Sequence, residues 1–375
     1  MYTHWPSRVP DRSDSLAVLV GTAGHIAPSE LPPLPQAAAN VADLKQVLTG
    51  PTGLFDPLTV HTVVDPPTPA QVLNILTLPG PTKRGLVLFY FAGHGILDTE
   101  DQLCLALPES IDKPRDAART GLSVNSLFAA LKHVRAQRKV VILDCCFAGR
   151  ALYDSAVGDV HVLCATGRPY RALTNADERN TGFTTALLRL LTEGLPDGPE
   201  FLDLSTLYRR LAVLVPTTPC PSDDEPERTL PAPRHRTTDI TEDVALVRNT
   251  AFGTSLSRTG LRSRAQFAQR VAEFGRRDSS PRSEYVAHAG TLFAEIAADA
   301  MSVFPRVDPQ VLRYRRAHAA LAGEAGNAAR AAEILKGIIG DLEAAAPGGG
   351  ADCKADRLSL EHWLNRVPDP NTPRF

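Results

Sequence analysis

Residues 139–149 read KVVILDCCFAG, and this stretch decides the fold. Residues 140–143, three β-branched side chains and a leucine, form a short apolar run that is typical of a strand buried on both faces of a parallel sheet. The run ends at Asp144, Cys145 and Cys146. Open α/β sheets hold their ligands beyond the carboxyl ends of the strands, so a carboxylate and two thiols here indicate chemistry. The alternative is that both cysteines are small core residues, as free cysteines often are.

A second apolar run, GLVLFYFAGHG at residues 85–95, ends in a Gly-His-Gly turn. His94 precedes Cys146 by 52 residues (146 − 94), which leaves room for one helix between two neighbouring parallel strands. The pattern therefore brings an imidazole and a thiol to one edge of the sheet. A thiol near its reference pKa of about 8.5 is mostly protonated at neutral pH and needs a base beside it to react. His94 can be that base, and the glycines at 93 and 95 leave amide N–H groups free for a developing oxyanion.

The two motifs, FAGHG and DCCFAG, resemble those of the caspase-like cysteine peptidases, and the metacaspase and bacterial branches more closely than animal caspases. Caspases carry their histidine roughly 50 residues before the cysteine, in agreement with the spacing here. The resemblance covers about residues 14–215. It implies the caspase-like fold, with His94 as the general base and Cys146 as the nucleophile. It also implies an oxyanion hole made by the N–H groups of Gly95 and Cys146, and it leaves Cys145 as a packing residue.

The residues around the nucleophile bear on the subfamily and on the substrate. Phe147 and Ala148 stand where metacaspases usually carry His and Ser. Asp144, two residues before the nucleophile, resembles the metacaspase pattern, whereas animal caspases carry Gln there. A buried carboxylate at the foot of the substrate pocket favours Arg or Lys before the cut, through charge-assisted hydrogen bonds worth roughly 1.5–3 kcal/mol each. We therefore expect Asp144 to bind substrate.

Two further side chains lie at candidate positions near this sheet edge. Arg168 follows a later strand, and we interpret it as solvated or paired with Asp177 or Glu178 rather than as part of the pocket. His25 follows the first strand and its GTAG turn, where it either contacts substrate or is a solvated bystander, as most loop histidines are.

The alternation of the remaining segments indicates a doubly wound, mostly parallel sheet with helices on both faces. This α/β architecture is also the caspase-like fold that the resemblance implies. Strands are predicted at 16–20, 58–64, 85–91, 103–107, 139–143 and 160–165, and helices at 35–48, 68–78, 121–134, 183–193 and 204–215.

Composition gives the class of protein and limits its partners. The 375 residues suggest two domains, and 43% hydrophobic with 22% charged residues is ordinary for a soluble protein. A net charge of −2, from 40 basic and 42 acidic residues, gives no global field that attracts nucleic acid or acidic membrane. No run approaches the roughly 18 apolar residues of a membrane span, and the N-terminus lacks the apolar core of a signal peptide. We expect a cytoplasmic protein with no nucleic-acid or membrane partner.

The cysteines indicate reduced thiols. They form no Cys-x-x-Cys pair and have no histidine at zinc-finger spacing, so we expect no metal and no cofactor. Calcium activation, as in some metacaspases, stays open. The six are Cys104, Cys145, Cys146, Cys164, Cys220 and Cys353.

Beyond residue 215 the composition changes. Residues 216–238 are rich in proline and mixed charge, which predicts an exposed linker, and cleavage by the enzyme itself after Arg228, Arg234 or Arg236 is a further expectation. The predicted organisation is a leader (1–13), a caspase-like peptidase domain (14–215), a Pro-rich linker (216–240), a helical interaction domain (241–367) and a tail (368–375).

An internal repeat is visible in the last third of the chain. Residues 289–321 align with residues 331–363 at an offset of 42, as helix, proline-containing turn and helix. This pattern predicts a helical-hairpin array, and GEAGNAARAAEIL (323–335) resembles a tetratricopeptide-type repeat. The alternative is a compact helical bundle. Either form offers a surface for a protein or peptide partner.

The sequence thus predicts a cysteine endopeptidase that uses a Cys-His dyad, acts on a protein or peptide, cleaves after Arg or Lys, and is regulated or targeted by its C-terminal helices. One alternative is a catalytically idle caspase-like adaptor or scaffold that only holds partners. Another is a non-peptidase hydrolase or thiol transferase on a similar sheet.

Overall fold

The computed structural model describes residues 9–78, 84–167, 178–221, 225, 227–236, 244–277, 282–346 and 353–367. The chain forms two compact units. The first contains Met1–Gly194 and Phe201–Thr250, and the second contains Leu195–Glu200 and Ala251–Phe375.

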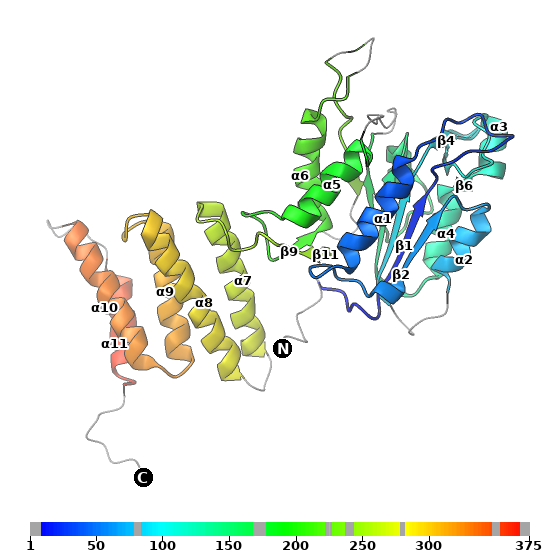
Figure 1. Ribbon diagram of the computed structural model, residues 1–375. Helices are drawn as coiled ribbons and strands as arrows, with labels where there is room; N and C mark the ends of the chain where they lie inside the picture. Colours follow the sequence, from blue (N-terminus) through cyan, green and yellow to red (C-terminus); the bar gives the residue numbers. More distant parts are fainter. Residues whose placement is uncertain are drawn as a thin grey trace. The chain divides into compact units, whose positions relative to one another are not determined.

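A six-stranded sheet forms the centre of the first unit (Figure 1). In spatial order its strands are β10 (Arg234–Arg236), β8 (His161–Cys164), β7 (Ala136–Asp144), β3 (Arg84–Ala92), β1 (Leu16–Gly21) and β2 (Val60–Val64). All neighbours pair in parallel except β10, which pairs antiparallel with β8. The strand order reverses between β1 and β3, and such switch points are where doubly wound sheets open a crevice for ligands. The predicted doubly wound sheet is confirmed.

Helices cover both faces of this sheet, as predicted. Helix α1 (Gln36–Thr49) packs against β1 and β3 on one face, next to α5 (Gly182–Glu193), which contacts α6 (Leu204–Leu214). Helices α2 (Pro69–Leu76) and α4 (Val124–His133) lie against each other and belong to the core of the opposite face. The side chain of Ser123 caps α4 by accepting a hydrogen bond from the Ser126 N–H at 3.1 Å, as a Ser at this position predicts.

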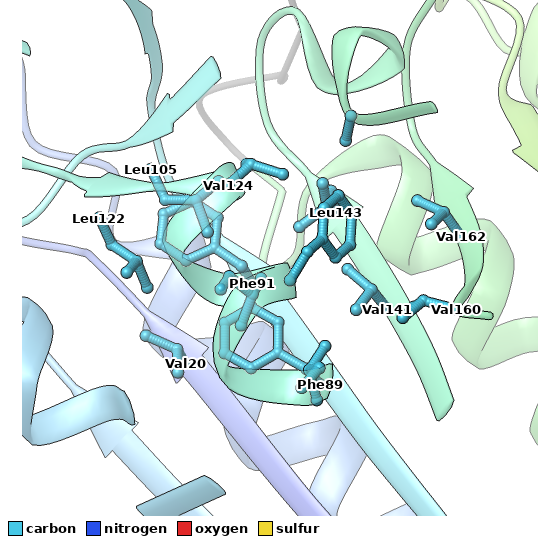
Figure 2. Close-up of a cluster of buried hydrophobic side chains, with 14 of the residues drawn as sticks. Val20, Phe89, Phe91, Leu105, Leu122, Val124, Val141, Leu143, Val160 and Val162 are labelled. Carbon is cyan, nitrogen blue, oxygen red and sulfur yellow. The ribbon is translucent and has the colours of Figure 1, made fainter. Parts of the chain in front are cut away.

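The core on the α2 and α4 face is built from alternate residues of the strands. Figure 2 shows Val20, Phe89, Phe91, Val141, Leu143 and Val162 from four neighbouring strands turning toward one cluster, where they meet Leu105, Leu122 and Val124. Phe89 and Phe91 are fully buried, and burying a side chain of this size contributes roughly 1.5–3 kcal/mol. Val141 and Leu143 of β7 therefore belong to this core, and the residues that alternate with them point to the opposite face.

Short elements extend this unit, and the sequence predicts only one of them, the strand within residues 103–107. A three-stranded antiparallel sheet comprises β4 (Gly95–Leu97), β5 (Leu103–Leu105) and β6 (Leu122–Ser123), and a two-stranded one pairs β9 (Phe201–Asp203) with β11 (Ala245–Arg248). Helix α3 (Pro114–Thr120) lies between β5 and β6 in the chain. The 3₁₀ turns are η1 (Pro57–Thr59), η2 (Ala148–Tyr153) and η3 (Val215–Thr217).

The expectation of an exposed linker at 216–240 is wrong for its described residues. Strand β10 is the edge strand of the main sheet, and residues 219 and 229 form a β-bridge. Cys220 and Leu230 are buried, and the Leu230 side chain packs on Gly182 of α5. Pro231 and Pro233 precede β10, so they remove no hydrogen-bond donor from its ladder. The strands also continue past residue 241, since β11 pairs with β9, so the first unit extends to Thr250.

The second unit is helical and keeps the predicted hairpins. Helices α7 (Arg258–Arg277), α8 (Arg282–Val303), α9 (Pro309–Glu324), α10 (Ala328–Ala345) and α11 (Lys354–Leu364) pack each against the next in sequence. In the first helix of each repeat, Ile296 in α8 and the equivalent Ile338 in α10 are both buried, whereas in the second helix Arg315 of α9 is buried and the equivalent Arg357 of α11 is exposed. In the part of the chain that the structure describes, none of the helices is both long and apolar enough to cross a bilayer.

Candidate active site

His94 lies in the turn that joins β3 to β4, at the switch point of the sheet. Its carbonyl accepts a hydrogen bond from Ala106 N–H at 2.9 Å, and the preceding Gly93 N–H donates to the Asp144 carbonyl at 3.3 Å. The His94 ring nitrogen Nε2 lies 2.8 Å from the carbonyl oxygen of Pro32. Because a carbonyl only accepts, Nε2 carries the proton and Nδ1 keeps a lone pair. The sequence gives no signal for Pro32, since any residue supplies a carbonyl.

Cys145 and Cys146 follow β7 and have different surroundings. The Cys145 side chain is fully buried in the core cluster, and burial together with the neighbouring Cys146 raises the pKa of its thiol well above the ordinary value. Cys146 is half-buried at the end of the strand. The next residue, Phe147, takes left-handed backbone angles (φ 58°, ψ 14°), which turn the chain into η2 at a cost of about 1–2 kcal/mol. Only the second thiol is therefore accessible.

His94 and Cys146 line one cleft of about 610 Å³. The backbones that carry them touch, because a Cβ on Gly95 would collide with the Cys146 carbonyl oxygen. The close approach requires glycine at this position. The structure thus brings together the predicted base, the predicted nucleophile and the predicted oxyanion donors. The other lining residues are Pro28, Glu30, Leu31, Pro32, Leu97, Ile111, Asp112, Lys113, Pro114, Asp116 and Phe147.

Acidic side chains outnumber basic ones around this cleft. Glu30, Asp112 and Asp116 line it, against Lys113. Asp116 also accepts a salt bridge from Arg119 at 2.8 Å. A cleft whose border carries an excess of one sign of charge favours a ligand of the other sign. The sequence does not reveal this feature, because Glu30 is far along the chain from Asp112, which precedes α3, and from Asp116, which lies in its first turn.

Asp144 is separate from the residues that line the cleft. Its side chain is only 3% exposed and faces α1 and α5, where one carboxylate oxygen accepts hydrogen bonds from the hydroxyls of Thr181 and Thr184, the latter at 2.6 Å. Thr184 also bonds the Tyr90 hydroxyl at 2.7 Å, and Thr181 accepts from the Asn40 amide at 2.8 Å. Burial raises the pKa of the Asp144 carboxyl, although both threonine hydroxyls act against the rise. No described basic side chain forms a salt bridge with it.

His25 lies beside the cleft histidine. The centroids of the His25 and His94 rings are 5.3 Å apart, and the Ser29 hydroxyl lies 3.4 Å from His25 Nδ1. Burial and the positive charge of a protonated His94 lower the pKa of His25. His25 is therefore held close to the site and is not a solvated bystander. Of the other candidates, Arg168 and Asp177 lie outside the described residues.

Asp43 of α1 binds two residues of the segment that precedes α5. Its carboxylate accepts two hydrogen bonds from the Arg179 guanidinium, at 2.7 and 2.9 Å, and one from Asn180 at 3.0 Å.

The described residues contain no group of three or more His, Cys, Asp or Glu side chains that could hold a metal ion.

The sheet order and the cleft define a caspase-type α/β fold with a cysteine and a histidine in one crevice. The family model of the caspase domain matches residues 14–234, and the chain belongs to this family. Among solved structures, the chain is similar to caspase-1 from Spodoptera frugiperda at 14% identity and a TM-score of 0.48, over 67% of this chain and 98% of that one. No curated protein matches the sequence.

Proposed function

We propose that this protein is a cysteine endopeptidase in which Cys146 attacks the substrate and His94 is the general base. The observation that carries the proposal is the shared cleft, in which the only accessible thiol of the Cys145-Cys146 pair borders the same space as an imidazole with a fixed tautomer. Membership of the caspase-domain family supports a cysteine peptidase. Among its branches, we place the chain nearer the metacaspases because of Asp144.

The mechanism starts from the tautomer of His94. The Pro32 carbonyl holds the proton on Nε2, so Nδ1 is free to take the proton of the Cys146 thiol. The thiolate then attacks the carbonyl carbon of the scissile peptide bond, and a tetrahedral oxyanion forms. The imidazolium returns its proton to the leaving amine, and a water molecule, activated by the same ring, hydrolyses the resulting thioester.

We further propose that the backbone N–H groups of Gly95 and Cys146 stabilise the oxyanion. Both residues line the cleft, and the contact between the Gly95 backbone and the Cys146 carbonyl fixes the two donors relative to each other. Donors fixed before the reaction need no reorganisation when the charge develops, and removing one such donor typically costs about 10²–10³ in kcat.

We propose a preference for Arg or Lys before the cut. The Asp144 carboxylate has only neutral hydroxyl partners among the described residues, and burial raises its pKa. Because Asp144 does not line the cleft, a cationic substrate side chain would meet this carboxylate only by extending beyond the cleft-lining residues. The acidic border of Glu30, Asp112 and Asp116 attracts the same kind of substrate.

The helical unit and the cysteines bear on how the peptidase is regulated and where it acts. We propose that α7–α11 form a tetratricopeptide-like interaction module that regulates or targets the peptidase. All six cysteines are outside disulfide bonds, which suits a protein of the reducing cytoplasm.

The test uses fluorogenic peptides that differ only in Arg, Lys or Asp before the scissile bond. The full-length protein should cleave the Arg and Lys peptides, Cys146→Ala and His94→Ala should lose this turnover, and Cys145→Ala should keep most of it. Faster cleavage after Asp contradicts the proposed preference. Equal losses in the two cysteine variants, with both folded by circular dichroism, contradict the assignment of the nucleophile. Absence of turnover on every peptide favours the idle adaptor.

A further inference from the structure

The helical unit contains a groove of its own. It measures about 420 Å³ and runs between α7 and α9, with the buried Phe293 of α8 among its lining residues. Short connections join α7 to α8 and α8 to α9, so α7 and α9 run in the same direction on either side of the groove. The other lining residues are Arg262, Ala265, Gln266, Gln269, Pro309, Gln310, Arg313, Tyr314 and Ala317.

Most arginines of α7 and α9 are occupied by acidic partners. Five of them form salt bridges to Asp or Glu, four to another helix and one to the residue that caps α9. These pairs are Arg258–Asp308, Arg264–Asp299, Arg276–Glu324, Arg315–Asp341 and Arg316–Asp356.

Arg262 of α7 and Arg313 of α9 differ from these five arginines in their surroundings. Both line the groove, both are exposed, and neither has an acidic partner among the described residues. Each stands four residues after the first residue of its helix, Arg258 in α7 and Pro309 in α9, so the two guanidiniums lie at the same end of the groove. Two unpaired guanidiniums that face a common space suit a ligand with carboxylates, which arginine binds through two parallel hydrogen bonds.

The rest of the lining suits a polypeptide. Gln266 is exposed and has no hydrogen-bond partner in the described part of the chain, so its amide can pair with both the N–H and the C=O of a peptide backbone. Ala265, Ala317 and Phe293 offer an apolar strip for one apolar side chain. Nucleic acid fits less well, because Phe293 and Tyr314 are 6% and 2% exposed and cannot stack on bases.

We propose that this groove binds an acidic peptide segment of a partner protein, with carboxylates on Arg262 and Arg313 and one apolar side chain over Ala265 and Ala317. The inference rests on the proposed role of α7–α11 as an interaction module, and it names the chemistry of the partner. It does not depend on the peptidase reaction.

The experiment measures binding to full-length protein that carries Cys146→Ala, so that no peptide is cut. The probes are two matched libraries of fluorescein-labelled eight-residue peptides. One library places two Asp or Glu residues at varied spacing around a Leu, and the other has Asn or Gln at the same positions. We expect members of the acidic library to bind, and the binding to weaken as the salt concentration rises.

The variant R262E/R313E should weaken that binding at least about 10-fold, because it places carboxylates where the ligand's carboxylates bind. R262A/R313A, which removes charge without reversing it, should also weaken it. The matched control is R330E/K336E on α10, which reverses the same amount of charge outside the groove and should change affinity less than about 2-fold.

The proposal is overturned if the Asn/Gln library binds as well as the acidic one, if R262E/R313E binds like the control, or if single-stranded oligonucleotides bind the groove and acidic peptides do not. Circular dichroism shows whether each variant is folded. Peptidase activity of R262E/R313E with Cys146 intact separates the two proposals, since a failed groove leaves catalysis unchanged and a failed peptidase leaves binding to the Cys146→Ala protein unchanged.

Discussion

Thr184 offers a quantitative test of the buried network under the nucleophile strand. The substitution Thr184→Val keeps the shape of the side chain and removes the hydroxyl, which bonds the Asp144 carboxylate at 2.6 Å and the Tyr90 hydroxyl at 2.7 Å. A buried bond to a charged group contributes roughly 1.5–3 kcal/mol, and a neutral one about 0.5–1.5 kcal/mol. Because Asp144 and Thr184 are almost completely buried, solvent does not screen the loss. We expect a local destabilisation of about 2–4 kcal/mol at pH 7.5.

The loss should depend on pH. Burial raises the pKa of Asp144, and the Thr184 hydroxyl opposes that rise, so removing it raises the pKa further. A carboxyl whose pKa is raised by folding is stabilising only while it is protonated, and this contribution is lost as pH rises above the ordinary value near 3.8. The effect of Thr184→Val should therefore be larger at pH 7.5 than at pH 4.5.

Amide hydrogen exchange measured by mass spectrometry is the suitable assay, because the two units need not unfold together. A loss of about 2–4 kcal/mol accelerates exchange in β3 and β7 by about 30- to 900-fold. Thr185→Val, the same change at the exposed neighbouring residue, is the control and should leave exchange nearly unchanged. Thr184→Ser, which keeps the hydroxyl, should recover most of the protection. Equal exchange in Thr184→Val and Thr185→Val would refute the network as described.

Two further predictions concern the cleft. Gly95→Ala should lower kcat/KM at least about 10-fold, because the added Cβ overlaps the Cys146 carbonyl and displaces the nucleophile. The control is Gly340→Ala, whose Cβ meets nothing within 4 Å. Equal activity of the two variants argues against the close contact between Gly95 and Cys146. His25→Gln should make stability less dependent on pH below about 6.5, since the lowered pKa of His25 means that the unfolded chain binds the proton first and wild-type stability falls with pH in that range. Thermal unfolding at pH 8 and pH 5.5 checks this, and identical pH dependence in the two proteins counts against it.

The main features of the fold and the dyad could be predicted from sequence because they rest on long apolar strands. β3 and β7 are continuous runs buried on both faces, and parallel pairing brings their carboxyl ends to one edge. The alternation of side chains in β7 also predicts that Cys145 turns into the core while Cys146 does not, and the structure has this arrangement.

The features that the sequence does not reveal depend on tertiary context. β10 has three residues in a Pro-rich segment, and it is a strand only because β8 offers an edge and Leu230 packs on Gly182. The Pro32 carbonyl that fixes the His94 tautomer has no signature in residue type. The prediction that Asp144 is buried is correct, but its hydroxyl partners come from the start of α5, about 40 residues further along the chain. Local patterns do not report such distant partners.

The structure bears on the expectation that the enzyme cleaves itself after Arg228, Arg234 or Arg236. Arg234 and Arg236 lie in β10, where Arg236 also donates to the Leu152 carbonyl at 2.9 Å. The Arg228 guanidinium donates to the Cys220 carbonyl at 2.9 Å. Cleavage after the two strand residues would require the edge strand to leave the sheet, so these bonds are protected in the folded protein.

The most direct test of the account is the alkylation rate of each cysteine by iodoacetamide near neutral pH, located by peptide mass spectrometry in the wild type and in His94→Ala. The account predicts that Cys146 reacts first among the six thiols, because it is half-buried and next to a base while Cys145 is enclosed in the core. In folded His94→Ala, the rate at Cys146 should fall at least about 10-fold. Equal rates at Cys146 in the two proteins, or first reaction at another cysteine, would contradict the Cys-His dyad.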